Sequence, residues 1–229
     1  GLGDVYKRQE CYIELLKNRG LNDKMILSFF KQACANYSRY GLTTLMTQAN
    51  NQDMLLIPDP SALLTTLSDQ TYIGAYVPHN LVLMSDIHRL KYAMYLNNDA
   101  YEALKKMIDA MPNEIANDFY VKEAYTSFTD LQYSNPNLAG KDERQLGHTV
   151  SIASKSIAYH EFETAALSQW LEAHSYEYGF ILRYPKRMAS STNHVYDAHY
   201  YRYVGKKNAN KIYKENSCIE EYNQKEAAE

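Results

Sequence analysis

The sequence predicts an α+β fold, in which a small antiparallel sheet is flanked by helices and preceded by a short helical N-terminal segment. Apolar residues recur at helical spacing early in the chain. Later, strand-like runs and amphipathic helices follow one another without a βαβ alternation. The 229 residues, 45% hydrophobic and 22% charged, have the composition of a folded globular protein. This length accommodates one substantial domain and a smaller appendage.

The first part of the chain is expected to be helical. Residues 1–9 match nothing downstream and lack a starting Met, so we interpret them as a cloning or sequencing scar that replaces any export signal. Residues 10–58 are predicted to be the helical N-terminal segment, because apolar residues such as Leu16 and Phe29 recur there at helical spacing. The IPDP sequence at residues 57–60 ends this segment, since proline lacks an N–H donor and restricts the residue before it. We therefore place the main domain at residues 59–205.

The main domain shows clear periodic elements. A helix is expected after Asn98, its predicted N-cap, with an apolar face that ends before Pro112. A second amphipathic helix carries Trp170 and Leu171 and ends before Gly179. The predicted strands occupy residues 63–77, 81–84, 119–125, 150–153, 180–184 and 200–204. The charged tail, residues 206–229, is expected to fray.

Composition excludes several classes of protein. A net charge of -3 and a pI near 6.2 give no reason to expect a nucleic-acid partner. No run of 18 or more apolar residues is present, so we predict no transmembrane segment. The 3 cysteines lie far apart and are interpreted as free thiols.

Three motifs, in one order, carry a family resemblance. They are ERQLGHTVSI at residues 143–152, YGFILRYP at residues 178–185 and YRYVG at residues 201–205. With these motifs, residues 72–205 resemble the VanY-type D-alanyl-D-alanine carboxypeptidases of bacterial cell walls, whose corresponding sequences read SEHQTGLAVDI, YGFILRYP and EPWHYRYVG. The resemblance implies a bacterial protein of the cell envelope or exterior, with a cytoplasmic location left open. It also implies a cell-wall peptide or a protein as the partner.

The residues that carry the family's chemistry are replaced. In that family, two histidines and an aspartate hold a catalytic zinc, and the glutamate of EPWH is the base. The three ligand positions correspond to Arg144, Ser151 and Tyr200, and the base position corresponds to Asp197. A guanidinium cannot lose its proton to bind a metal, and neutral hydroxyls are poor zinc ligands. We therefore predict that no metal cofactor is bound and that the chain is more consistent with a pseudoenzyme.

The predicted substrate groove is altered as well. The family's substrate-binding arginine corresponds to Thr126, which precedes Ser127. Its loss removes a bidentate partner for the C-terminal carboxylate of a peptide. Arg202, in the YRYVG motif, is the remaining arginine that we assign to the groove.

Several alternatives stay open from the sequence. His148 and His199 are possible substitute ligands for a displaced zinc site with Asp197, although a one-residue slip in a strand turns a side chain to the opposite face. Arg144 is predicted either to replace the zinc charge by pairing with Asp197, supported by Ser151 and Tyr200, or to extend into solvent. The corresponding functions are a non-cleaving domain that binds peptide or protein, an active zinc D,D-carboxypeptidase, and a structural or interaction module.

Overall fold

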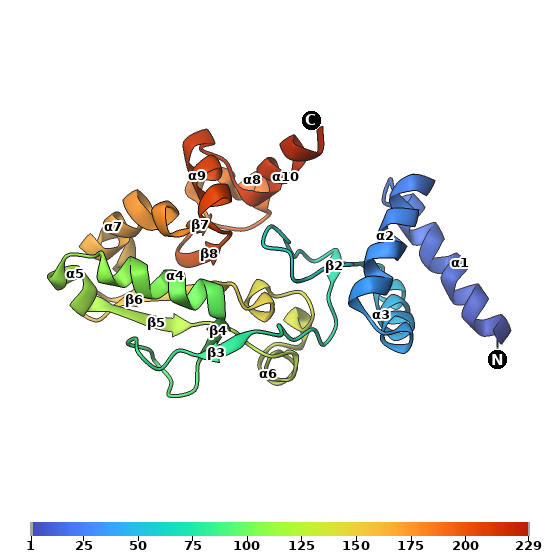
Figure 1. Ribbon diagram of the computed structural model, residues 1–229, viewed down its shortest axis with the longest axis horizontal. Coiled ribbons are helices and arrows are strands. Elements are labelled where there is room, and N and C mark those ends of the chain that lie inside the picture. Colours follow the sequence, from blue (N-terminus) through green and yellow to red (C-terminus); the bar gives the residue numbers. More distant parts are fainter. Residues whose placement is uncertain (1, 229) are drawn as a thin grey trace. The chain divides into compact units, whose positions relative to one another are not determined.

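The computed structural model describes residues 2–228, apart from the side chains of residues 2–6, 8, 39 and 40 (Figure 1). The chain forms two compact units. The first comprises Gly1–Val77 and Ser127–Gln145, and the second comprises Pro78–Thr126 and Leu146–Glu229. None of the helices in residues 2–228 has the length and apolar character that crossing a bilayer requires.

The first unit begins with three helices, as predicted for the N-terminal segment. Its elements are α1 (Leu2–Asn18), α2 (Asp23–Asn36), α3 (Arg39–Asn51), β1 (Leu55–Leu56), β2 (Thr71–Tyr72), α6 (Phe128–Ser134), η1 (Pro136–Leu138) and most of η2 (Glu143–Leu146). Buried Tyr12, Leu16 and Phe29 from the helices share one core with Leu56 and Tyr72. Residue 1 lies outside the described residues and residues 2–9 open α1, so their interpretation as a scar stays a prediction.

The strand expected over residues 63–77 is wrong for most of its length. Only β2 forms there, paired in parallel with β1. Hydroxyl side chains nearby bond to the local backbone instead: Thr65 Oγ1 donates to the Asp59 carbonyl at 3.1 Å, and Ser68 N donates to Thr71 Oγ1 at 2.7 Å. Such local bonds compete with the ladder of a sheet.

The second unit contains the predicted antiparallel sheet and confirms the α+β fold. The four strands, in the order β5-β6-β8-β7, are β5 (Phe119–Glu123), β6 (Thr149–Ser154), β8 (Asp197–Tyr203) and β7 (Phe180–Tyr184). A separate hairpin pairs β3 (Leu81–Leu83) with β4 (Tyr95–Asn97). The helical elements of this unit are α4 (Asn98–Asp109), α5 (Asn113–Asp118), η3 (Tyr159–Thr164), α7 (Ala166–His174), η4 (Ser175–Tyr178), η5 (Lys186–Met188), α8 (Ala189–Thr192), α9 (Lys206–Glu215) and α10 (Ile219–Ala228).

One face of this sheet is buried beneath helices. Apolar residues of α4 and α7 share a core with β5, β6, β7 and β8, and α4 runs alongside β5 and β6 (Figure 1). Ser151 of β6 and Tyr200 of β8 alternate with core residues of their strands and therefore lie on the opposite face of the sheet.

The N-cap of α4 is Asn97 rather than Asn98, because the Asn97 side chain accepts from the backbone N–H of Asp99 at 2.9 Å.

Gly179 fixes the turn from η4 into β7. Its φ of +92° lies in the left-handed region, and a Cβ there would come within 2.8 Å of the Tyr203 ring. This conformation explains why the YGFILRYP motif has a glycine in its second position.

The charged tail does not fray, contrary to our expectation. Residues 206–228 form α9 and α10, whose apolar residues Ile212, Ile219 and Tyr222 are buried. Arg183 of β7 is only 1% exposed in its side chain and lies 2.6 Å from the Glu220 carboxylate of α10. The tail therefore has its own apolar and ionic attachments to the fold.

Candidate functional site

Two of the residues predicted to occupy the family's zinc-ligand positions are neighbours in the sheet. The strand register places Ser151 of β6 opposite Tyr200 of β8 on one side and opposite Glu123 of β5 on the other. Residues directly opposite one another in an antiparallel pair share a face, so these three side chains form a row across the sheet. Tyr200 Oη donates a hydrogen bond of 2.9 Å to Glu123 Oε2. The residue at the second histidine position is thus held by a carboxylate of the fold.

Tyr159 of η3 lies close to this row. Burial raises the pKa of Tyr159, the Ser151 hydroxyl acts in the opposite direction, and the charges of Asp197 and Glu123 raise it further. Ser151 is 1% exposed, and among residues 2–228 its hydroxyl has no hydrogen-bond partner that meets normal geometry. The row is therefore a polar, largely enclosed cluster.

Asp197 is the residue predicted to correspond to the family's catalytic base. It is the first residue of β8, opposite Tyr184, and its Oδ1 accepts a 2.9 Å hydrogen bond from the backbone N–H of His199. The carboxylate thus shapes the start of β8 and also acts electrostatically on Tyr159.

His199 is poorly suited to bind a metal. Its Nδ1 lies 2.7 Å from the Ile152 carbonyl oxygen, and its Nε2 lies 2.9 Å from the Tyr159 carbonyl oxygen. The ring also stacks between those of Tyr159 and Phe162, with centroid distances of 3.6 and 4.3 Å. Both ring nitrogens face carbonyl oxygens at hydrogen-bond distance, and in the neutral ring the nitrogen that donates its N–H has no lone pair for a metal.

His148 lies elsewhere on the sheet. The backbone N–H of Tyr203 donates a hydrogen bond to the carbonyl oxygen of His148. His148 therefore lies beside the last residue of β8, four residues after His199 in that strand. Four residues of a strand span about 13 Å. Burial and the charge of Arg202 lower the pKa of His148 to about 3, so it is neutral at ordinary pH. The two histidines are not brought together.

These donors do not fit the family's zinc. In the described part of the chain, no three His, Cys, Asp or Glu side chains gather closely enough to hold a metal ion. The nearest substitutes offer a phenol already bonded to Glu123, a serine hydroxyl and a histidine bonded to carbonyl groups. Neutral hydroxyls are weak zinc donors.

Arg144 has a partner within its own unit. Its Nη2 lies 2.6 Å from Asp142 Oδ2, its Nε is 3.0 Å from Asp142 Oδ1, and the Arg144 side chain is 18% exposed. It does not extend freely into solvent. Its predicted pairing with Asp197 stays a prediction.

The three predicted groove residues have local roles in the fold. Thr126 Oγ1 donates to the Ala124 carbonyl at 3.2 Å, and Ser127 is the N-cap of α6, with Oγ accepting from Asp130 N at 3.1 Å. Arg202 is 0% exposed and lies within the fold. None of the three reproduces the open guanidinium that would bind a peptide carboxylate.

Sequence reasoning missed Glu123 and Tyr159. Glu123 carried one available signal, because a charged residue near the end of a predicted apolar strand is unusual in a core and suggests a functional face. Tyr159 carried none, since it reaches the row from a 3-10 turn that the sequence pattern did not indicate.

Known proteins resemble this chain in both sequence and fold. Residues 118–206 match the family model described as VanY, D-alanyl-D-alanine carboxypeptidase. A D-alanyl-D-alanine carboxypeptidase of Enterococcus faecalis (strain ATCC 700802 / V583) is 30% identical over 192 residues, which cover 79% of this chain and 70% of that protein.

Solved structures give the same result. The LdcB LD-carboxypeptidase is 27% identical with a TM-score of 0.68, and the match covers 75% of this chain and 90% of that one. A variant of the vancomycin-resistance D,D-pentapeptidase VanY, in complex with Zn(II), is 25% identical with a TM-score of 0.55, covering 70% and 98% of the two chains.

Proposed function

Because this chain belongs to the VanY family of D-alanyl-D-alanine carboxypeptidases, we propose that it is a non-cleaving, zinc-free member that binds peptide at the bacterial cell wall. The observation that carries this proposal is the row of Glu123, Ser151 and Tyr200. A hydrogen bond between two of its members occupies a position where the family's pattern has a metal ligand. With Thr126 in place of the substrate-binding arginine, the chain also lacks the family's partner for a terminal carboxylate.

The proposal includes a location and a partner. Relatives named as D-alanyl-D-alanine carboxypeptidases support a bacterial protein of the envelope or exterior, whose ligand is a cell-wall peptide. A polar cluster with a buried hydroxyl retains hydrogen-bonding capacity for a peptide even without a metal.

Restoring the family's ligands tests the proposal directly. The triple variant Arg144→His, Ser151→Asp and Tyr200→His is expected to hold about one zinc per chain, because it recreates two imidazoles and a carboxylate. The unmodified chain is expected to hold none after purification in the presence of zinc. Metal content is measured by atomic emission, and D-alanine release is measured with an acetylated Lys-D-Ala-D-Ala peptide.

The control is the same triple variant with Asp197→Asn, which keeps the three ligands and removes the base-position carboxylate. Stoichiometric zinc in the unmodified chain, together with zinc-dependent D-alanine release, would contradict the proposal and favour a displaced metal site. If the unmodified chain holds no zinc and also fails to bind the acetylated peptide in a calorimetric titration, the interaction-module interpretation replaces peptide binding.

A further inference from the structure

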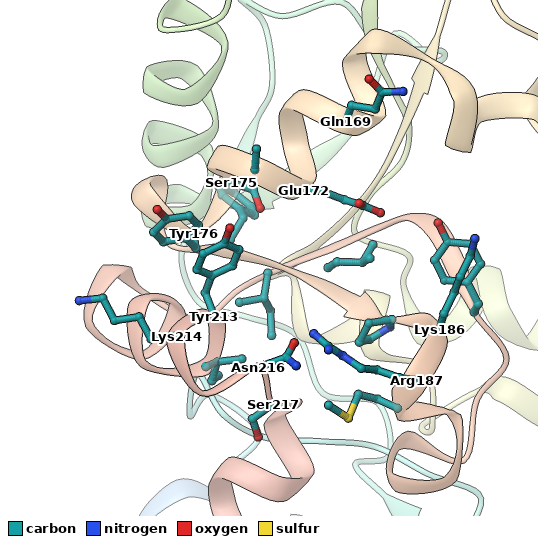
Figure 2. A pocket seen from close by; sticks show the side chains of 18 of the residues that line it. Gln169, Glu172, Ser175, Tyr176, Lys186, Arg187, Tyr213, Lys214, Asn216 and Ser217 are labelled. Carbon is teal, nitrogen blue, oxygen red and sulfur yellow. The ribbon is translucent and has the colours of Figure 1, made fainter.

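A groove of about 990 Å³ lies beside β7 in the second unit, between α7, η4, η5 and α9 (Figure 2). Phe180 and Leu182 of β7, with Met188 and Ile212, supply apolar surface, and polar side chains surround it. Its lining contains none of the residues at the family's metal, base or substrate positions. Its volume lies within the range typical of ligand sites, and many of its lining side chains are polar or charged.

The charges in this groove are separated. Glu163 is paired with Lys186, whereas Glu172 and Arg187 form no ion pair among the described residues. Glu172 projects from α7 and Arg187 from η5, so that an anion and a cation reach the hollow from different walls (Figure 2). Lys214 and Asn216, from α9 and its C-cap, add further donors to the lining.

A buried tyrosine, Tyr201 of β8, is close enough to two lining residues to feel their charges. Tyr201 is 0% exposed, and within residues 2–228 its hydroxyl has no hydrogen-bond partner. Burial raises its pKa well above the ordinary value, and the neighbouring Glu172 and Tyr196, both in the groove lining, raise it further. Tyr201 is fully buried and is not one of the lining residues, so a ligand in the groove meets Glu172 and Tyr196 instead.

The position of β7 favours an extended ligand. It is an edge strand of the four-stranded sheet, and three successive residues of it, Phe180, Ile181 and Leu182, line the groove. An edge strand has no neighbouring strand on one side, and extended peptides use such edges for main-chain hydrogen bonds.

We propose that this groove binds a short extended peptide with free ends, its amino group at Glu172 and its carboxylate at Arg187. Charge complementarity fixes the class of ligand, since a carboxylate beside aromatic rings suits an ammonium and a guanidinium suits a carboxylate. The site is separate from the row of Glu123, Ser151 and Tyr200. The proposal that this groove binds a peptide is therefore independent of the zinc-free function proposed above.

The test uses tetra-alanine with free ends, its N-acetylated form and its C-amidated form, titrated into the full chain and followed by backbone amide NMR shifts. The free-ended peptide is expected to shift the amides of Glu172, Leu182 and Arg187. Blocking either end should weaken binding about tenfold, the loss expected for one charge-assisted hydrogen bond.

Two variants assign each end. Acetylation should weaken binding to the unmodified chain but not to Glu172→Gln, and amidation should weaken binding to the unmodified chain but not to Arg187→Gln. The matched control is Glu177→Gln, which lies near Glu172 in sequence but outside the groove and pairs with His174 at 3.0 Å. It should bind like the unmodified chain.

Three results would overturn the proposal: no amide shifts with millimolar peptide, equal affinity for the blocked and free-ended peptides, or shifts confined to Ser151 and Tyr200. The comparison of blocked and free-ended peptides on the unmodified chain needs no variant to fold. If a variant unfolds, the peptide comparison on the unmodified chain still tests the proposal.

Discussion

At the scale of single residues, His148 links stability to pH. Its folded pKa of about 3 lies below the unfolded value of 6.5. As the pH falls below 6.5, His148 becomes protonated in the unfolded chain but stays neutral in the folded chain. The contribution of His148 to the free energy of unfolding is therefore complete above pH 6.5 and is lost progressively as the pH falls toward 3.

We expect the free energy of unfolding to fall by about 1.4 kcal/mol per pH unit from this residue between about pH 6 and pH 4. Urea denaturation of His148→Asn over that range should show a correspondingly weaker dependence on pH. The control is His160→Asn, because the His160 side chain is 81% exposed. Identical slopes for the His148 variant and the unmodified chain would show that the buried imidazole does not resist protonation.

The family's motifs predict which residues correspond to its site, because such motifs are continuous in sequence, and for Ser151, Asp197 and Tyr200 this stays a prediction. The contacts of these residues could not be predicted from the sequence. The contacts of Tyr200 with Glu123 and of His199 with two carbonyl oxygens depend on the strand register and on a bulge between Val121 and Glu123. A register shift of this kind leaves no signature in hydrophobic periodicity.

At the scale of elements, α10 is fixed to β7 by the ion pair of Arg183 and Glu220. Removing one partner leaves a guanidinium that is only 1% exposed without its carboxylate. We expect Glu220→Gln to lower the free energy of unfolding by about 3 kcal/mol. Hydrogen exchange of the α10 amides should accelerate, since the helix loses its ionic attachment.

The control on the same helix is Glu226→Gln. Its side chain is 48% exposed and pairs with Lys211 at the surface, so the free energy of unfolding and the exchange rates should stay unchanged. Unaltered protection of α10 in Glu220→Gln would mean that apolar contacts alone hold the helix.

Elements with a buried apolar pattern were predicted well. The strands at residues 119–125, 150–153, 180–184 and 200–204 are confirmed within a few residues, as are the helices that carry Leu104 and Trp170. The tail was misjudged because charged residues dominate it, although Ile212, Ile219 and Tyr222 are buried. Average charge concealed a narrow apolar stripe, which is enough to attach a short helix.

At the scale of the whole molecule, the chain has two hydrophobic cores built from separate sets of residues. Separate cores favour departures from all-or-none unfolding. We expect two calorimetric transitions, each sensitive to substitutions in one unit only. Tyr12→Phe should lower the transition of the first unit by a few degrees, because the Leu56 N–H loses its 2.7 Å hydrogen bond to Tyr12 Oη.

Glu220→Gln should shift the other transition, and Tyr133→Phe serves as the neutral control because Tyr133 is 89% exposed. A single transition that moves with both Tyr12→Phe and Glu220→Gln would show that the two cores unfold as one cooperative structure.

The hydrogen bond from Tyr200 to Glu123 also bears on how such a protein evolves. Tyr200→His alone removes the donor from a partly buried carboxylate while two ligand positions remain unsuitable. Ser151→Asp alone places a second carboxylate opposite Glu123, which is repulsive. Each single substitution is therefore expected to cost stability without creating a metal site, and only the combination supplies the family's ligands. Such non-additivity between substitutions is epistasis, and it would keep a chain with this tyrosine and serine from acquiring zinc one substitution at a time.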